Sequence, residues 1–423
     1  MRLRSVAALV YSAALLFLWT CRSGIPAVSR QNQAGFYDPQ AELLRADFVM
    51  HNESPATSRL YFRVNASQLL YTRPLNSNIY TAKLLLSYIL HPRNAQTTIA
   101  DSGHVVLTDE GTPGENKLLS GSIAMRIKQP GQYTVEVSLR DLSKMTVRSE
   151  LLFLDQESKD AAQQFLLITQ EATVPLFRSY TDTNEQLQLR CPKGAKRIQV
   201  RRYSAVAGPA APPFLITAAP ETSKPDSTWW LETDSVLAFR AVRTGRYSFH
   251  TSEISKSGFV LTCVQRGYPL VRKVQQLIDP LRYLTQREEF AKLTADTAPK
   301  KAVDKFWLDR AGSEERAREV IRRFYQRVEQ TNVLFTTDRE GWQTDRGMTY
   351  LIFGQPQSVY RFPAYEVWYY GNDSGNSNTL SFTFLLYTEN GVTDFLLERN
   401  LSYKINWLAA VDAWRQGQVY TAR

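Results

Sequence analysis

The sequence has few of the residues on which most enzyme chemistry depends. Its 423 residues include only four histidines and three cysteines. No histidine follows His250, so the last third of the chain cannot build an internal Ser-His-Asp triad. No close cysteine pair or His-Glu-x-x-His pattern indicates zinc, and no glycine-rich loop indicates a bound phosphate. We therefore predict no metal and no cofactor, and we identify no catalytic residue.

Long hydrophobic runs are also scarce, and the only clear one stands at the beginning of the chain. Residues 6–19 are almost wholly apolar and follow Arg2 and Arg4. This run is too short to span a bilayer comfortably but suits a signal peptide. It ends in Leu-Trp-Thr-Cys, which resembles a lipobox, so we predict lipid attachment at Cys21. A cleaved soluble periplasmic protein and an uncleaved anchor are the alternatives.

The residues after Cys21 bear on the destination of the protein. Arg22-Ser23-Gly24 contains neither the aspartate of inner-membrane retention nor the acidic cluster of surface export. We therefore expect an outer-membrane lipoprotein of the cell envelope that faces the periplasm. With Cys21 carrying lipid, Cys191 and Cys263 remain as an even pair. They form either a disulfide, which an exported compartment permits, or two separate buried thiols.

Charge and composition set broad limits on fold and partners. The net charge is +10, but no dense Lys/Arg tract appears. We interpret the surplus as a solvated basic surface and expect no nucleic acid partner. Hydrophobic residues make up 43% of the chain and aromatic residues 12%, enough for several cores.

Short alternating runs fill most of the chain up to residue 275. Residues 121–127 and 131–139 alternate around a Pro-Gly turn, and residues 197–201 and 244–249 repeat the pattern. Such runs, separated by turn residues, are typical of β-sandwiches. We predict a multidomain chain with two all-β immunoglobulin-like sandwiches and a C-terminal α+β domain. The predicted segments are the signal peptide 1–21, a tether 22–44, the sandwiches 45–160 and 170–275, and the α+β domain 280–423.

Helical patterns begin after Pro280. Pro299 suits the first turn of one helix, and Ser313 is a candidate N-cap for a second, amphipathic helix. Strand patterns return after Gly341, and a Glu-Asn-Gly turn indicates a hairpin. The predicted strands span 348–353, 365–370, 380–387 and 392–397, and residues 403–414 form a helix or an irregular apolar cap.

One stretch of this domain carries a family resemblance. Residues 340–356 read EGWQTDRGMTYLIFGQP, preceded by Phe306-Trp307 and followed by YEVWYY at 365–370. This set resembles the GWxTD domain family over about residues 280–420. The resemblance implies an exported bacterial protein, as in many Bacteroidetes and Acidobacteria, and implies no catalytic residue. The family usually has Arg-Asp after Phe-Trp, whereas this chain has Arg310-Ala311.

Two interpretations of the motif stay open. In the structural one, Gly341 adopts a conformation closed to other residues, Trp342 anchors the core, and Thr344 and Asp345 bond to backbone amides. In the functional one, the motif forms a ligand site with residues further along the chain. The candidate binding residues are Trp342, Thr344, Asp345, Arg346, Glu366 and Trp368.

These interpretations lead to two hypotheses of function. The first is a non-catalytic envelope lipoprotein that presents the C-terminal domain to an envelope protein partner. The second is cell-wall glycan binding or hydrolysis, with Asp345 and Glu366 as a carboxylate pair and exposed tryptophans stacking on sugars. Five of the eight tryptophans fall in the C-terminal third, where they serve either as core or as such stacking residues.

Overall fold

A computed structural model describes most of the chain after residue 30. The described residues are 31–38, 43–73, 75, 77–144, 147–169, 174–204, 208–216, 224–371, 379–389 and 391–420. The predicted signal peptide and lipid-acceptor Cys21 lie outside them. Among the helices in these ranges, none combines the length and the hydropathy that a membrane crossing requires.

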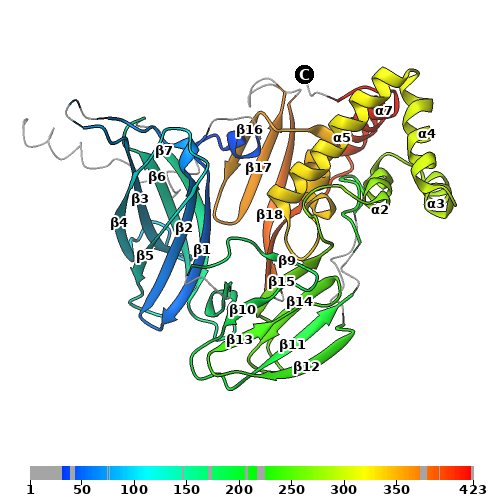
Figure 1. The fold of residues 1–423 in the computed structure, drawn as a ribbon. Coiled ribbons are helices and arrows are strands. Elements are labelled where there is room, and N and C mark those ends of the chain that lie inside the picture. Colours follow the sequence, from blue (N-terminus) through cyan, green and yellow to red (C-terminus); the bar gives the residue numbers. More distant parts are fainter. Residues whose placement is uncertain are drawn as a thin grey trace, which may run out of the picture.

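The first β-rich part consists of seven strands in two antiparallel sheets (Figure 1). The sheets have the orders β1-β2-β5 and β4-β3-β6-β7, and they bury one shared apolar cluster. Alternate residues of β2 are buried, as the period-two pattern predicts for a strand with one face on a core. The strands are β1 (Ala46–Ser54), β2 (Thr57–Asn65), β3 (Thr81–Pro92), β4 (Asp101–Glu110), β5 (Leu118–Arg126), β6 (Gln132–Asp141) and β7 (Val147–Asp155).

The second β-rich part also has two sheets around one core, ordered β13-β10-β8 and β12-β11-β14-β15-β9. Cys191 follows β10 and Cys263 lies in β15, so the two residues belong to different sheets. Both are free buried thiols, and the disulfide alternative is therefore wrong for this structure. The strands are β8 (Leu166–Ile168), β9 (Tyr180–Asp182), β10 (Leu187–Arg190), β11 (Arg197–Tyr203), β12 (Ser227–Glu232), β13 (Val236–Phe239), β14 (Gly245–His250) and β15 (Phe259–Val264).

The C-terminal part combines helices with a four-stranded antiparallel sheet of order β16-β17-β18-β19. In Figure 1 the helices gather on the side of this sheet away from β1–β7. The chain is thus multidomain and β-rich with a helical C-terminal region, as predicted. The elements are α2 (Val274–Ile278), α3 (Arg287–Ala295), α4 (Pro299–Ala311), α5 (Glu314–Phe335), α6 (Asp345–Phe353), β16 (Ser358–Arg361), β17 (Tyr365–Tyr370), β18 (Leu380–Glu389), β19 (Val392–Leu397) and α7 (Tyr403–Arg415).

Local sequence signals explain where α4 and α5 begin and end. Pro299 opens α4, and Gly312 ends it with a φ of +72°, a conformation that glycine adopts without strain. The hydroxyl of Ser313 then accepts a hydrogen bond from the N–H of Arg316 and caps α5. The predicted starts of both helices are confirmed.

The predicted strand at residues 348–353 is wrong, because this segment belongs to helix α6. Thr344 caps the helix, and eight of its nine residues are buried. A segment buried on all sides shows neither the helical nor the strand period, so its apolar run did not distinguish the two. The chain end at 403–414 is a helix, α7, which was one of the two predicted alternatives.

The predicted tether is wrong for residues 31–38, which pack against the C-terminal part. Residues Ala34–Tyr37 form the short helix η3, and Tyr37 is only 4% exposed. The N–H of Gln33 donates to the Val359 carbonyl of edge strand β16 at 2.7 Å. The polar and turn-forming composition of this segment concealed the apolar contacts that Tyr37 makes.

Candidate functional site

The segment 341–347 folds as a short helical turn that passes directly into helix α6. The turn η7 (Gly341–Gln343) ends at Thr344, the N-cap residue of α6. The Thr344 hydroxyl donates to the Gly341 carbonyl at 2.8 Å and accepts from the Gly347 N–H at 3.0 Å. This one side chain satisfies both ends of the turn and caps α6. The predicted bond from Thr344 to a backbone amide is confirmed.

The two glycines of this segment are required by close backbone approach. A Cβ atom on Gly341 would lie 1.8 Å from the Thr331 carbonyl oxygen, and one on Gly347 would lie 1.8 Å from the Gly341 carbonyl oxygen. Neither glycine has a positive φ. The prediction that Gly341 adopts a conformation closed to other residues is therefore wrong, and its role is steric.

Trp342 and Asp345 both point into the domain. Trp342 is 3% exposed, and its indole N–H donates to Glu340 at 2.8 Å. Asp345 is 5% exposed; one carboxylate oxygen accepts the Leu397 N–H at 2.9 Å, and both oxygens meet the guanidinium of Arg399, the closer at 2.5 Å. This bidentate pair joins the first turn of α6 to the chain just after β19.

A loop from the second β-rich part closes over the motif. The described residues 208–216 lie between β11 and β12. The Ala210 N–H donates to the Gln343 carbonyl at 2.8 Å, and Arg399 donates to the Ala211 carbonyl at 3.1 Å. Phe214 packs against the C-terminal core. The motif thus lies at a junction between two parts of the chain.

A second group of polar residues lies in the sheet next to the motif, and we call Tyr37, Arg361, Glu366 and Trp368 the Glu366 cluster. Glu366 is fully buried, accepting from Arg361 Nε at 2.7 Å, from the Tyr37 hydroxyl at 2.7 Å and from the Trp368 indole. Burial alone would raise the pKa of Glu366, but the charges of Arg361 and Arg346 and the hydrogen bonds from Trp368 and Tyr37 outweigh it and hold the pKa below its usual value.

Arg346 connects this cluster to a further acid. Its guanidinium lies 3.9 Å from Glu366 and 3.7 Å from Asp394, between the rings of Phe335 and Phe395. Burial raises the pKa of Asp394 to about 6, although Arg346 opposes the shift. Because Asp394 is also near Asp338, two carboxylates share this end of the sheet.

Asp338 extends the network to the second β-rich part. Arg246 of β14 lies 3.2 Å from the Asp338 carboxylate, with side-chain exposures of 11% and 7%. Close by, the Thr262 hydroxyl of β15 donates to the Thr337 carbonyl at 2.8 Å. These contacts make β14 and β15 one side of the junction.

The structure brings the six candidate binding residues into one region but does not open them to solvent. Each has a side chain or whole residue that is at most 11% exposed. The carboxylates of Asp345 and Glu366 are each occupied by an arginine, so neither is available as an acid or a nucleophile in this conformation. The residues concerned are Trp342, Thr344, Asp345, Arg346, Glu366 and Trp368.

The tryptophans of the C-terminal third are also closed to solvent. The five in the C-terminal third are all at most 3% exposed and belong to one apolar cluster. They are Trp307, Trp342, Trp368, Trp407 and Trp414. A sugar cannot stack on these rings without opening the domain, so the core interpretation is confirmed.

The sequence did not indicate the residues that pair with the candidate carboxylates, namely Tyr37, Arg361 and Arg399, nor the residues Arg246, Asp338 and Asp394 that extend the network. Arg361 had a detectable signal, because it lies directly opposite Glu366 in the β16–β17 hairpin. Tyr37 and Arg399 had none, since 329 and 54 residues separate them from their partners. Within the described ranges no group of three or more His, Cys, Asp or Glu side chains is arranged to hold a metal ion.

Comparison with known proteins agrees with this description of the motif. The GWxTD domain family matches residues 245–416. The chain contains a GWxTD domain. The match begins at Gly245, so it covers β14 and β15 of the second β-rich part as well as most of the C-terminal part. The Arg246–Asp338 pair therefore lies within it.

Other comparisons add little. No curated protein matches the chain. Among solved structures, red sea bream transglutaminase is similar with 9% identity and a TM-score of 0.18, over 53% of this chain and 32% of that chain. The match spans about a third of the length of the transglutaminase.

Proposed function

We propose that the protein is a non-catalytic lipoprotein of the cell envelope that acts as an interaction or assembly module for another envelope protein. The proposal rests on one observation: the acidic side chains of the GWxTD motif region are already paired with arginines of the same chain. Asp345 and Glu366 are buried and bound by Arg399 and Arg361. The candidate reactive groups therefore stabilise the fold of their own domain. We place the function of the protein on its outer surfaces instead.

The proposed location in the cell envelope rests on the first residues of the chain. The apolar run at residues 6–19 and the Leu-Trp-Thr-Cys sequence support export and lipid attachment at Cys21. The resemblance to exported GWxTD proteins supports the same location. We place the protein at the outer membrane, facing the periplasm.

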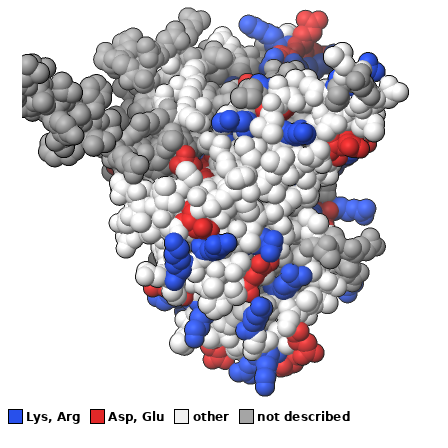
Figure 2. Space-filling model, turned by 90° about the vertical axis from the view of Figure 1, so that its left-hand side faces the viewer, with Lys and Arg blue, Asp and Glu red and all other residues white. Residues whose placement is uncertain are grey.

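The two β-rich parts serve in this proposal as the modules that present the C-terminal α+β part. We propose that residues 45–160 and 170–275 are immunoglobulin-like sandwiches, since each has two sheets around one apolar cluster. Figure 2 shows a face on which Lys and Arg are interspersed with Asp and Glu. This mixture favours a protein surface as partner over nucleic acid.

Photo-crosslinking in native membranes tests the proposal. We expect the full-length protein to fractionate with the outer membrane and to crosslink to one partner in constant ratio. A Cys21→Ser variant should leave the membrane fraction. A protein that stays solitary under crosslinking would contradict the interaction role, and unchanged membrane association of Cys21→Ser would contradict lipid anchoring.

A second experiment distinguishes the proposed interaction function from the glycan alternative. Purified protein is incubated with isolated peptidoglycan, and both the bound fraction and released sugar fragments are measured. We expect neither binding nor release. Binding or cleavage that is lost in Asp345→Ala, while the variant remains folded, would favour the glycan role over ours.

A further inference from the structure

Helix α7 carries a row of apolar side chains on its solvent-facing side. Leu401, just before the helix, and Ile405 and Leu408 within it are 66%, 80% and 45% exposed, respectively. Spacings of four and three residues are those of one helix face. The other face of α7 already supplies Trp407 and Trp414 to the core. The exposed apolar face is therefore a second one, which the fold of a single chain does not explain.

A loop from the second β-rich part adds to this apolar surface. The Asn400 N–H donates to the Pro213 carbonyl at 3.1 Å, which holds the loop beside the beginning of α7. The two residues of the loop that follow Phe214 are apolar and exposed. We define the α7 face as the five exposed apolar residues of this loop and helix, namely Leu215, Ile216, Leu401, Ile405 and Leu408. Such a group on a surface is typical of an interaction site.

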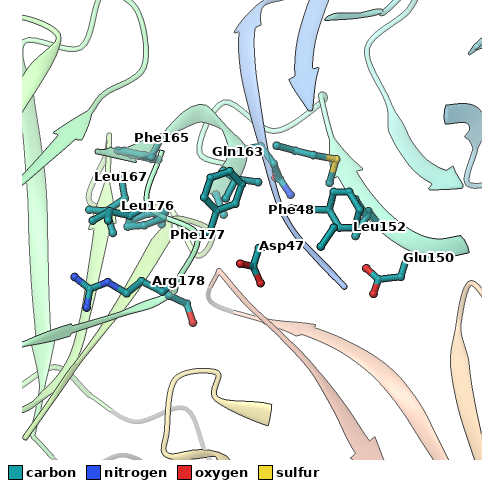
Figure 3. A pocket seen from close by; sticks show the side chains of 16 residues that line it. Asp47, Phe48, Glu150, Leu152, Gln163, Phe165, Leu167, Leu176, Phe177 and Arg178 are labelled. Carbon is teal, nitrogen blue, oxygen red and sulfur yellow. The ribbon is translucent and has the colours of Figure 1, made fainter. Parts of the chain in front are cut away.

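A second apolar surface of the molecule has its partners within the chain. A hollow of 520 Å³ lies between the two β-rich parts. Figure 3 shows Phe48 and Leu152 of the first part on one side and Phe165, Leu167 and Leu176 of the second part on the other. Because residues of both parts already meet across this hollow, it does not call for another chain. The α7 face differs, since its side chains remain exposed, and in Figure 1 α7 lies away from β1–β7.

Two charges on α7 favour a second copy of this chain as the occupant. Lys404 and Asp412 are exposed, and neither forms an ion pair with a described residue. They lie four residues before and four residues after Leu408, so the three side chains form one row along the helix. If a second α7 packs antiparallel about a twofold axis at Leu408, each Lys404 lies opposite Asp412 of the partner subunit. The face is thus complementary to itself, as a twofold interface requires.

We propose that two copies of this chain associate through the α7 face, with their α7 helices antiparallel and Leu408 on the twofold axis. The apolar side chains of the two faces cover one another, and two Lys404–Asp412 pairs between the copies fix the antiparallel direction. The inference goes beyond the proposed function, because it concerns contact between two copies and holds whether or not another envelope protein binds.

Disulfide crosslinking through Leu408→Cys tests the twofold axis. A residue on such an axis meets its own copy, so the thiols of two chains come together. We expect oxidation of native membranes that contain the full chain to give a disulfide-linked dimer on a non-reducing gel. Ile254→Cys is the matched control, because Ile254 is also exposed but lies between β14 and β15. It should stay monomeric on the gel, as should wild type, whose Cys191 and Cys263 are buried.

Reversal of the two charges tests the antiparallel direction. The dissociation constant of the dimer is measured by sedimentation equilibrium on the full chain in detergent. Lys404→Glu and Asp412→Lys each replace two attractive pairs by two repulsive ones, so each should weaken association about tenfold. The double variant restores opposite charges and should return to within about twofold of wild type. All variants should unfold as wild type does, because both side chains are exposed.

The proposal is overturned if the wild-type chain sediments as a monomer or if Leu408→Cys crosslinks no more than Ile254→Cys. It is also overturned if the double variant stays as weak as the single ones, because the antiparallel direction is then wrong. Crosslinks from position 408 to a different protein would assign the α7 face to that protein. This last result would remove the dimer and support the interaction function, so the two proposals fail separately.

Discussion

Two glutamates withdrawn from solvent show how differently this chain uses buried charge. Glu366 accepts hydrogen bonds from Tyr37, Arg361 and Trp368, and its pKa lies below its usual value. Glu150 of β7 accepts no hydrogen bond from the described residues and lies 3.5 Å from the Arg148 guanidinium, and burial raises its pKa above the usual value. Several direct hydrogen bonds thus outweigh the burial of Glu366, whereas the longer ion pair of Glu150 does not. The predictions below test this contrast.

The largest effect is expected at the tightest backbone contact of the GWxTD motif. In Gly341→Ala the new Cβ would lie 1.8 Å from the Thr331 carbonyl oxygen, so the backbone must move. We expect a loss of at least about 4 kcal/mol in the free energy of unfolding. Chemical denaturation measures it. Gly208→Ala is the control, because a Cβ at that position would meet nothing within 4 Å, and its stability should stay within about 0.5 kcal/mol of wild type.

The two glutamates themselves can be compared by one substitution. Glu366→Gln leaves Arg361 buried without its counter-charge, and we expect a loss of about 3–5 kcal/mol. Glu150→Gln removes a carboxylate whose pKa is raised by burial, but also the counter-charge of Arg148 at 3.5 Å, so we expect a loss of at most about 1 kcal/mol at neutral pH. Equal losses in the two variants would remove the contrast.

The buried carboxyl of Asp394 should make the stability of the protein depend on pH. Burial raises its pKa from 3.8 in the unfolded chain to about 6 in the folded one. The folded state therefore favours the protonated carboxyl, and this stabilisation is complete below about pH 3.8 and is lost as the pH rises through 6. From pH 4 to 7, wild type should lose up to about 3 kcal/mol relative to Asp394→Asn. A difference between the two proteins that is the same at both pH values would contradict this assignment.

A smaller effect is expected from the segment predicted to be a tether. Tyr37→Phe removes the hydroxyl that joins Glu366 at 2.7 Å and Arg361 at 2.8 Å, and we expect a loss of about 1–3 kcal/mol. Tyr61→Phe in β2 is the matched control, since its hydroxyl forms no hydrogen bond with the described residues. Its loss should stay below about 0.5 kcal/mol. Wild-type stability in Tyr37→Phe would mean that residues 31–38 are not part of the folded domain.

The sequence allowed the strands and the amphipathic helices to be predicted, because burial on one face leaves a periodic pattern. It failed at residues 348–353, where burial on all sides removes the period. It also failed at Tyr37, whose partner Glu366 is 329 residues away. The six candidate residues lie in one region of the structure, but the pairing of their carboxylates with Arg361 and Arg399 depends on tertiary contacts that no local pattern encodes.

The central claim is that the acid of the GWxTD motif holds the fold, and the unfolding free energy of Asp345→Asn tests it most directly. The variant leaves Arg399 facing a neutral amide in a buried pair whose side chains are 5% and 15% exposed. We predict a loss of about 3–5 kcal/mol at neutral pH. Substitution of a residue that serves binding rather than folding often leaves the stability unchanged or raises it. Unchanged or increased stability in Asp345→Asn would therefore contradict the account.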